Sequence, residues 1–500
     1  MNTALQSKKP PYMMIVILFV GAFVSFLNNS LLNVALPSIM VDLKIDNYST
    51  VQWLATGYML VSGVLIPASA FLITRFSNRS LFITSMLIFT LGTAMAAFAP
   101  NFAVLLSGRM VQAAGASVMG PLLMNVMLIS FPREKRGTAM GIFGLVMITA
   151  PAIGPTLSGY IVEYFDWRIL FMMILPLAVL SLLLSVWKLE NVMETDKTAT
   201  IDYLSVVLST LGFGGLLYGV SSASSDGWTD PVILTTLIVG GIALIAFIVR
   251  QLKMEKPLLD LRAYKYPMFA LASVIAIVNA VAMFSGMILT PAYVQNVRGI
   301  SPLDSGLMML PGAIVMGIMS PITGKLFDKF GPRVLALTGL VITGISTYLL
   351  SELQIDSSYP YIILIYTLRM FGMSMVMMPI ITNGLNQLPT RLNPHGTAIN
   401  NTAQQVSGSI GTAVLVTIMN SVTKTEAESM MTGIDPTTVT EQSMALLGQQ
   451  ALLSGIQYSF LVTLGINIVA IVLALFLKRV DVSSREAISK IEEAGKEKVS

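Results

Sequence analysis

Long uncharged stretches constrain this chain more than any other feature of its sequence. Between Arg136 and Glu163 it runs for over twenty residues without a charged side chain. A helix needs about 20 consecutive apolar residues to cross a bilayer. Fourteen apolar stretches of this kind follow one another, at roughly 12–34, 51–73, 80–99, 102–127, 137–161, 168–189, 203–222, 231–250, 268–294, 303–324, 334–353, 359–386, 396–420 and 453–477.

The composition agrees with a membrane protein. Hydrophobic residues make up 54% of the 500 residues and charged residues 11%, whereas soluble domains carry about 25% charged residues. One soluble core cannot bury so much apolar surface. The chain has no cysteine, which excludes disulfides and thiolate metal sites, and its single histidine, His395, excludes a site with several histidines. We expect no cofactor.

The basic residues predict the topology. With the N-terminus inside, most loop lysines and arginines, such as Arg75, Lys135 and Lys329, fall on one side of the membrane. The positive-inside rule then places both termini in the cytoplasm. The net charge of +4 reports this topology and not a nucleic-acid partner. On the same count, residues 421–452 form a large exterior loop.

An internal repeat predicts two halves. The segment SAFLITRFSNR, 69–79, recurs as TGKLFDKFGPR, 323–333, and Arg109 recurs as Arg369 at nearly the same offset. Both members of each pair fall on the same side of the membrane, so the halves are parallel repeats. We expect an all-helical membrane protein whose parts are a six-helix bundle over 1–189, a linker with two extra spans over 190–266, a second six-helix bundle over 267–477 and a cytoplasmic tail over 478–500.

The stretch from Ala150 to Gly159 is dense in helix breakers, including Gly154 and Pro155. Neighbouring helices can accommodate such residues inside a membrane, and small residues allow close approach. One reading is a bendable span, and the other is an ordinary helix-packing motif.

These features resemble the major facilitator superfamily. Its fifth-helix antiporter motif is matched here by Gly141, Ala150, Gly154, Pro155, Ser158 and Gly159. The segment LNNSLLNVALP, 27–37, resembles the first-helix signature of its fourteen-span drug:proton antiporters, and the whole chain resembles Gram-positive pumps of the lincomycin-resistance type. The resemblance implies the major facilitator fold, a bacterial cell membrane, and proton-coupled multidrug efflux by alternating access.

The arginines of the fourth and twelfth stretches are candidate coupling residues. Arg109 cannot lose its charge, and burying it near the bilayer centre costs about 2.5–3.5 kcal/mol. Gln112 shares its helix face, and the pair resembles the family's fourth-helix motif, which is implicated there in proton transfer. The alternative is structural pairing alone. We expect Arg369, with Gly372 in place of the glutamine, to be more structural.

The intact loop copy after the tenth stretch contains Asp328 and Arg333, whereas the first copy has Thr74 in place of the aspartate. We expect Asp328 to hold closed contacts by pairing with a helix N-terminus or a nearby arginine.

Polar and aromatic side chains within the spans are candidate cavity residues. Asn28, Asn29 and Asn33 are costly in lipid and should face the interior, as substrate contacts or as hydrogen-bonding groups between helices. The family usually has an aspartate where Asn28 stands, and an asparagine cannot carry a proton. The remaining candidates are Gln52, Trp53, Asn125, Gln404 and Gln405.

Three functions fit these features. No Walker loop, nucleophile elbow or metal-ligand cluster is present, so we expect a gradient-driven transporter and not an enzyme. The first function is proton-driven efflux of amphiphilic drugs, the second is export of an endogenous metabolite, lipid or nucleotide messenger, and the third is a sensor or an importer. The expected partners are small amphiphilic substrates, protons and the bilayer, and we expect a monomer. No span carries a central carboxylate, so the proton carrier is not identified.

Overall fold

A computed structural model describes residues 12–45, 48–132, 135–193, 195–196, 201–432 and 441–479. Within these ranges the regular secondary structure is helical throughout. The main helices are α1 (Tyr12–Asp42), α2 (Tyr48–Arg75), α3 (Asn78–Ala97), α4 (Phe102–Ser130), α5 (Arg136–Tyr164), α6 (Arg168–Lys188), α7 (Tyr203–Asp226), α8 (Pro231–Lys253), α9 (Pro267–Ala292), α10 (Pro302–Phe330), α11 (Pro332–Ser351), α12 (Tyr359–Ser374), α13 (Met377–Gln387), α14 (Asn393–Met431) and α15 (Glu441–Ala474). Short helical turns at Leu261–Lys265, Tyr293–Val297 and Thr390–Leu392 complete the order.

The fourteen expected spans are confirmed. By length and composition, the described residues contain 14 helical segments that can cross a membrane, with α12 and α13 forming one of them. Their succession reflects the alternation of long apolar stretches and short polar loops in the sequence.

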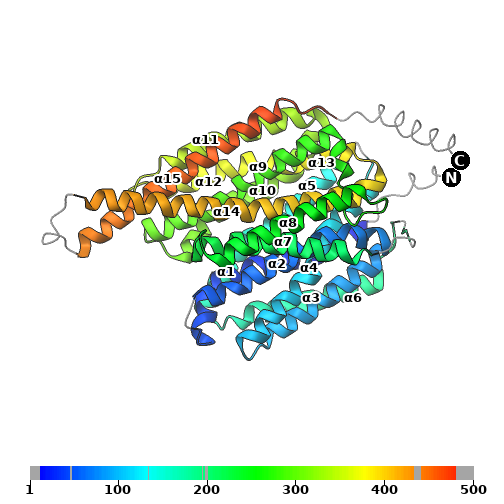
Figure 1. Cartoon of the computed structure of the whole chain (residues 1–500), viewed down its shortest axis with the longest axis horizontal. Coiled ribbons are helices and arrows are strands. Elements are labelled where there is room, and N and C mark those ends of the chain that lie inside the picture. Colours follow the sequence, from blue (N-terminus) through cyan, green and yellow to red (C-terminus); the bar gives the residue numbers. More distant parts are fainter. Residues whose placement is uncertain are drawn as a thin grey trace.

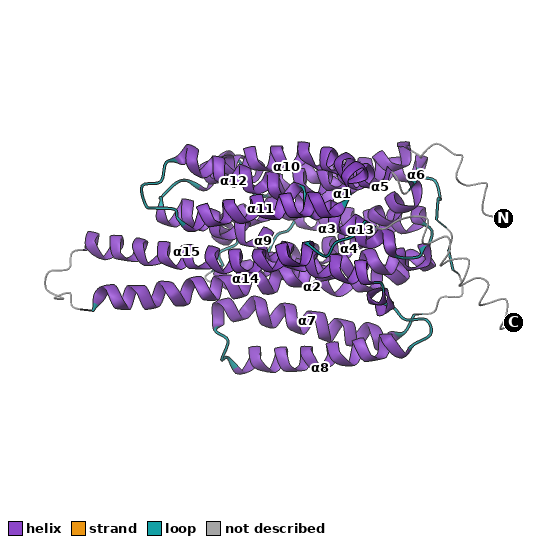
Figure 2. Cartoon of the chain, turned by 90° about the horizontal axis from the view of Figure 1, so that it is seen from above, coloured by secondary structure: helices purple, strands orange, loops and turns teal. Residues whose placement is uncertain are grey.

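The helices form two packed groups (Figure 1), and two further helices lie at one side of them (Figure 2). The first group is α1–α6, and the second is α9–α15. The groups meet where α5 packs on α10 and α2 packs on α14. Helices α7 and α8 pair with each other at one edge of the molecule (Figure 2), and α7 contacts both α2 and α14. The inserted pair therefore borders both groups.

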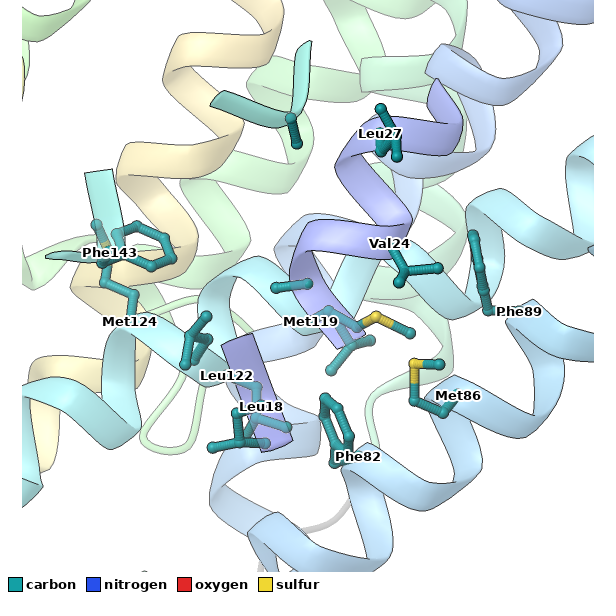
Figure 3. Close-up of a cluster of buried hydrophobic side chains, with 14 of the residues drawn as sticks. Leu18, Val24, Leu27, Phe82, Met86, Phe89, Met119, Leu122, Met124 and Phe143 are labelled. Atoms are coloured by element: carbon teal, nitrogen blue, oxygen red, sulfur yellow. The ribbon is translucent and has the colours of Figure 1, made fainter. Parts of the chain in front are cut away.

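Buried apolar side chains hold the first group together. Leu18 and Val24 of α1 lie against Phe82 and Phe89 of α3 and Leu122 of α4 (Figure 3). All five side chains are less than 8% exposed. This interdigitation fixes α4 in place, and α4 carries Arg109.

At the end of the inserted pair opposite the turn between its helices, a salt bridge joins Asp202, the N-cap residue of α7, to α8. Arg250 Nε lies 2.8 Å from Asp202 Oδ2. The hydrogen bond from Arg250, helped by Ser205, lowers the pKa of Asp202 to about 2. The carboxylate therefore stays ionised at neutral pH and keeps the two helices paired.

The span expected over 359–386 is interrupted. Helix α12 ends at Ser374 and α13 begins at Met377. Pro379 lacks the N–H that would bond to the Met375 carbonyl, and its ring crowds that carbonyl. The break lies beside the central cavity, because Val376 and Met377 line it.

The segment expected to form a large exterior loop, 421–452, is helical over most of its length. Residues 421–431 continue α14, residues 441–452 begin α15, and residues 433–440 lie outside the described ranges. The two helices extend beyond the rest of the molecule (Figures 1 and 2). Close packing stabilises this hairpin, since a Cβ added to Gly455 would lie 2.5 Å from the Met419 carbonyl oxygen.

Candidate functional site

A cavity of about 280 Å³ lies between the two groups of helices. Its wall comes from α1, α2, α4 and α5 on one side and from α9, α13 and α14 on the other. Methionine, phenylalanine and isoleucine side chains, with smaller apolar residues between them, form its apolar surface. Its polar surface consists of hydroxyl and amide groups, among them Asn29, Tyr58, Asn279, Asn401, Gln404 and Gln405.

The structure places the candidate cavity residues in different surroundings. Asn29, Gln404 and Gln405 line the cavity. Trp53 instead packs against Tyr218 of α7, with ring centroids 5.5 Å apart.

Two further candidates lie behind the wall. Asn125 is buried in α4 and donates from Nδ2 to Met193 Sδ at 3.6 Å. Asn28 is 2% exposed and bonds to Gln112. The side chains of Asn33 and Gln52 fall outside the described part of the structure.

Arg109 is the centre of a buried polar network. Its Nη1 donates to Gln112 Oε1 at 3.0 Å, and its Nε donates to the Leu54 carbonyl at 3.4 Å. Gln112 Nε2 donates to Thr93 Oγ1 at 2.9 Å, and Asn28 Nδ2 donates to Gln112 Oε1 at 3.2 Å. Arg109 and Gln112, which were expected to share a helix face, bond to each other, and their network connects four helices.

Tyr58 couples this network to the cavity. The Arg109 guanidinium carbon lies 4.4 Å from the centre of the Tyr58 ring, and Tyr58 lines the cavity wall. A cation over an aromatic face is attracted by the ring quadrupole. The charge of Arg109 is therefore separated from the cavity by one aromatic ring.

Arg369 has simpler surroundings. Its Nη2 donates to the Ala282 carbonyl and, at 3.0 Å, to Ser285 Oγ, both on α9. Its guanidinium also lies 5.9 Å from the Phe460 ring. Unlike Arg109, it has no hydrogen bond to an amide side chain within the described part of the chain, and its bonds tie α12 to α9.

Asp328 connects the two groups at one end of the bundle. We call this the basic end, because it contains the loops with Arg75, Lys135 and Lys329. Asp328 Oδ1 accepts from the Gly137 N–H at 3.0 Å, and Oδ2 accepts from Thr138 N at 3.0 Å and Thr138 Oγ1 at 2.8 Å. The expected contact of Asp328 with a helix N-terminus is observed.

The partner of Asp328 is the start of α5. The first N–H groups of a helix lack intrahelical acceptors, and a carboxylate there also interacts with the helix dipole. Lys135, at the N-cap position of α5, provides no side-chain cap. Asp328 of the other group supplies that cap.

Arg479 contacts the same end of α10. Its Nη2 donates to the Asp328 carbonyl at 2.7 Å and its Nη1 to the Lys329 carbonyl at 3.4 Å. It thus caps the C-terminal end of α10, where cations are favourable. Arg333, the other candidate of this loop, is exposed in the first turn of α11.

Glycines bring α5 and α10 into backbone contact at the basic end. A Cβ added to Gly324 would lie 2.3 Å from the Gly137 carbonyl oxygen, and one added to Gly141 would lie 2.5 Å from that of Ser320. Ser320 Oγ also donates to the Gly141 carbonyl at 2.8 Å. No side chain larger than hydrogen fits at either glycine without a shift in backbone.

The rest of the fifth-helix motif faces two neighbours. A Cβ on Gly154 would lie 1.9 Å from Ser30 Oγ of α1, and Ser30 Oγ is also 3.4 Å from the Ala150 carbonyl. Ser158 is fully buried. Gly159 approaches Leu303 of α10 only at 3.4 Å. Helix α5 runs unbroken through Pro155.

Sequence reasoning did not single out Tyr58, Asn279, Asn401, Thr138 or Arg479. A spacing of four residues between Tyr58 and Ser62 could have indicated a polar face on α2. The role of Arg479 depends on a contact over 151 residues, for which the sequence carries no local signal.

Comparisons with known proteins agree with this arrangement. The model of the Major Facilitator Superfamily matches residues 18–412. The chain is 52% identical to the MFS-type transporter YhcA of Bacillus subtilis over 83% of this chain and 77% of that protein. It is 43% identical to the lincomycin resistance protein LmrB of Bacillus subtilis, over 96% of this chain and 99% of that protein.

A solved structure shares the fold. The human organic anion transporter MFSD10 (TETRAN) matches with a TM-score of 0.62 at 12% identity, covering 92% of this chain and all of that one.

Proposed function

The chain belongs to the major facilitator superfamily, and we propose that it is a proton-coupled efflux transporter for amphiphilic compounds, including antibiotics. It is a multi-pass membrane transporter and not an enzyme. The observation that carries the efflux proposal is similarity to a lincomycin resistance protein along nearly the whole chain. The substrate, the proton and the direction of transport belong to the proposal.

Alternating access follows from the position of the cavity. The cavity lies between the two groups of helices, so rocking one group against the other exposes it to either side of the membrane. The contacts of Asp328 and Gly324 with the start of α5 close the basic end. The positive-inside rule makes this end cytoplasmic, so these contacts close the cavity to the cytoplasm.

In this mechanism substrate enters from the cytoplasm or the inner leaflet after the Asp328 contacts break. The amide and hydroxyl groups of the wall bind polar atoms of the substrate, and the methionines adapt to apolar parts. Closure of the α5–α10 contact then commits the substrate to release on the other side. This cycle moves substrate outward when proton entry is coupled to reopening.

Arg109 is our candidate for the coupling residue. It keeps its proton at all physiological pH values, so it acts by holding Gln112 and Tyr58 and by biasing the protonation of groups that enter the cavity. Its network spans α1, α2, α3 and α4, and any rearrangement of these helices must change it.

Two experiments test the function. A drug-susceptibility panel on cells that express the chain should show raised resistance to amphiphilic antibiotics. In inverted vesicles, drug addition should release protons, and Arg109→Ala should abolish this release in an inserted protein. Arg109→Lys should restore only part of it, because an ammonium lacks the planar donor fork. Unchanged drug-driven proton release in Arg109→Ala would show that Arg109 has a structural role and not a coupling role.

Dedicated export of an endogenous metabolite, lipid or nucleotide messenger is the second candidate. YhcA, at 52% identity, is named only as a transporter, so this similarity does not point to drugs. Unchanged susceptibility to every drug, together with a metabolite that accumulates inside deletion cells, would favour this function.

A further inference from the structure

Within the described residues, the fully buried charges of the membrane-spanning helices are both positive. Arg109 and Arg369 are fully buried. From Tyr48 to Pro132, which covers α2, α3 and α4, the sequence contains no aspartate or glutamate, and none occurs from Pro267 to Leu303. Neither arginine takes part in a salt bridge in the described part of the chain.

The hydrogen-bonding capacity of these arginines is also incompletely used. Within the described residues, Arg109 Nη2 has no partner, and neither do Arg369 Nε and Nη1. The partners that the arginines do have are carbonyl, amide and hydroxyl oxygens, which are neutral. Buried charge without a counter-charge is costly, so a negative ligand nearby is stabilised.

Arg109 is close enough to act on the cavity. Its guanidinium lies against the Tyr58 ring at 4.4 Å, and Tyr58 is part of the cavity wall. The rest of the wall is neutral: every described lining residue is apolar, a hydroxyl or an amide. The amide N–H groups of Asn29 and Gln404 are suitable donors to an anion.

We propose that the central cavity selects amphiphilic anions, such as organic carboxylates and sulfonates, over cations of the same shape. The proposal deepens the export function and rests on it only in taking this cavity as the substrate site. Arg109 supplies the positive potential, and the amides and hydroxyls supply hydrogen bonds. A positive unit charge about 8 Å from the ligand, at an effective dielectric constant of about 20, changes the ligand's affinity roughly thirtyfold. It raises the affinity for an anion and lowers the affinity for a cation.

The test compares tetraphenylborate with tetraphenylphosphonium, two ions of nearly the same shape and opposite charge. Their binding to the purified full-length transporter is measured by titration, with empty micelles as the background. The wild-type protein should bind the borate at least tenfold more tightly. Arg109→Gln should reduce this preference to within about threefold, because the potential is removed.

Two isosteric variants add a negative charge to the wall. Gln404→Glu and Asn29→Asp should each weaken borate binding and strengthen phosphonium binding. The ratio of the borate affinity to the phosphonium affinity should fall about tenfold in each variant. Asn101→Asp is the matched control, because Asn101 is exposed at the N-cap of α4, where an aspartate is equally suitable. Its ratio should stay within twofold of the wild type.

Equal binding of the two ions, tighter binding of phosphonium, or binding of neither would overturn the proposal. So would the same change in ratio for Asn101→Asp and Gln404→Glu. None of these outcomes decides whether the protein exports drugs. Resistance to cationic or neutral antibiotics in the susceptibility panel would uphold efflux while anion selectivity fails.

Discussion

The contact between α5 and α10 differs at its two ends. At the basic end the backbones touch, since an added Cβ on Gly324 would lie 2.3 Å from the Gly137 carbonyl oxygen. At the opposite end the same helices are ordinary neighbours: an added Cβ on Gly306 would lie 3.5 Å from Thr156 Oγ1, and one on Gly159 would lie 3.4 Å from Leu303.

This difference identifies the basic end as the one at which the two backbones fit closely together. Contact between two backbones leaves no side chain that can adjust, so it either forms or does not form. A contact through side chains can loosen gradually as rotamers change. The carboxylate of Asp328 adds three hydrogen bonds across the tight end only. In the proposed mechanism the basic end is therefore a discrete gate, and the opposite end can separate more easily.

The largest expected effect comes from a methyl group at the tight end. Gly324→Ala should lower transport at least tenfold, because its Cβ would overlap the Gly137 carbonyl and prevent closure. Gly306→Ala, on the same helix and facing the same neighbour, should retain at least half of the activity. Both changes raise the helix propensity by about 1 kcal/mol. A difference in transport between the two variants therefore reports on the packing against α5. Export into vesicles, normalised to inserted protein, measures it.

If the two alanine variants transport equally well, the backbone contact is not needed for the cycle. If Gly324→Ala fails to insert, cysteine accessibility at the basic end in Asp328→Asn, which adds no atom to the backbone contact, tests the same closure.

A smaller loss is expected from the carboxylate. Asp328→Asn keeps the shape but weakens three charge-assisted hydrogen bonds, each worth about 1.5–3 kcal/mol when made to a charged group. Transport should fall about tenfold at normal abundance. Thr74→Ala, at the equivalent position of the first repeat, should change transport less than twofold, because among the described residues Thr74 Oγ1 bonds to Ala70 of its own helix, at 2.8 Å. Equal losses would remove the asymmetry between the repeats.

A moderate loss is expected from the threonine partner. Thr138→Val removes the hydroxyl that donates to Asp328 Oδ2 at 2.8 Å but leaves both backbone N–H donors in place. A net contribution of about 1 kcal/mol predicts a three- to fivefold loss of transport. Thr138→Ser should behave like the wild type. A valine variant with full activity would show that the backbone donors alone hold the gate.

The smallest effect on transport is expected from Arg369. Its bonds join α12 to α9 within one group of helices, so Arg369→Ala should reduce the amount of inserted protein more than the activity per molecule. Quantitative blotting beside the vesicle assay separates the two. A full-length, abundant but inactive Arg369→Ala protein would contradict this assignment.

The sequence allowed much of this arrangement to be predicted. Spans follow from apolar length alone, and the repeat of 69–79 at 323–333 indicated two halves. The contact of Asp328 with a helix N-terminus was predictable in kind, because a carboxylate at a helix end needs donors. Its partner Thr138 was not, since 190 residues separate the two. The break before Met377 and the long hairpin of α14 and α15 depend on local packing that periodicity does not reveal.

Candidate cavity residues were harder to assign from sequence. Asn28 and Asn29 are neighbours, yet one bonds to Gln112 behind the wall and the other lines the cavity. A turn of 100° per residue separates such side chains, and only the packing of α1 decides which face meets the cavity.

Distances across the two ends of α5 and α10 test the central claim most directly. Spin labels at Lys135 and Lys329 report on the basic end, and labels at Glu163 and Leu307 report on the opposite end; all four side chains are exposed. We predict one narrow, short distance for the basic-end pair in the resting transporter. Asp328→Asn should shift that pair to longer distances and bring the opposite pair together. A basic-end distribution that Asp328→Asn leaves unchanged would contradict the account.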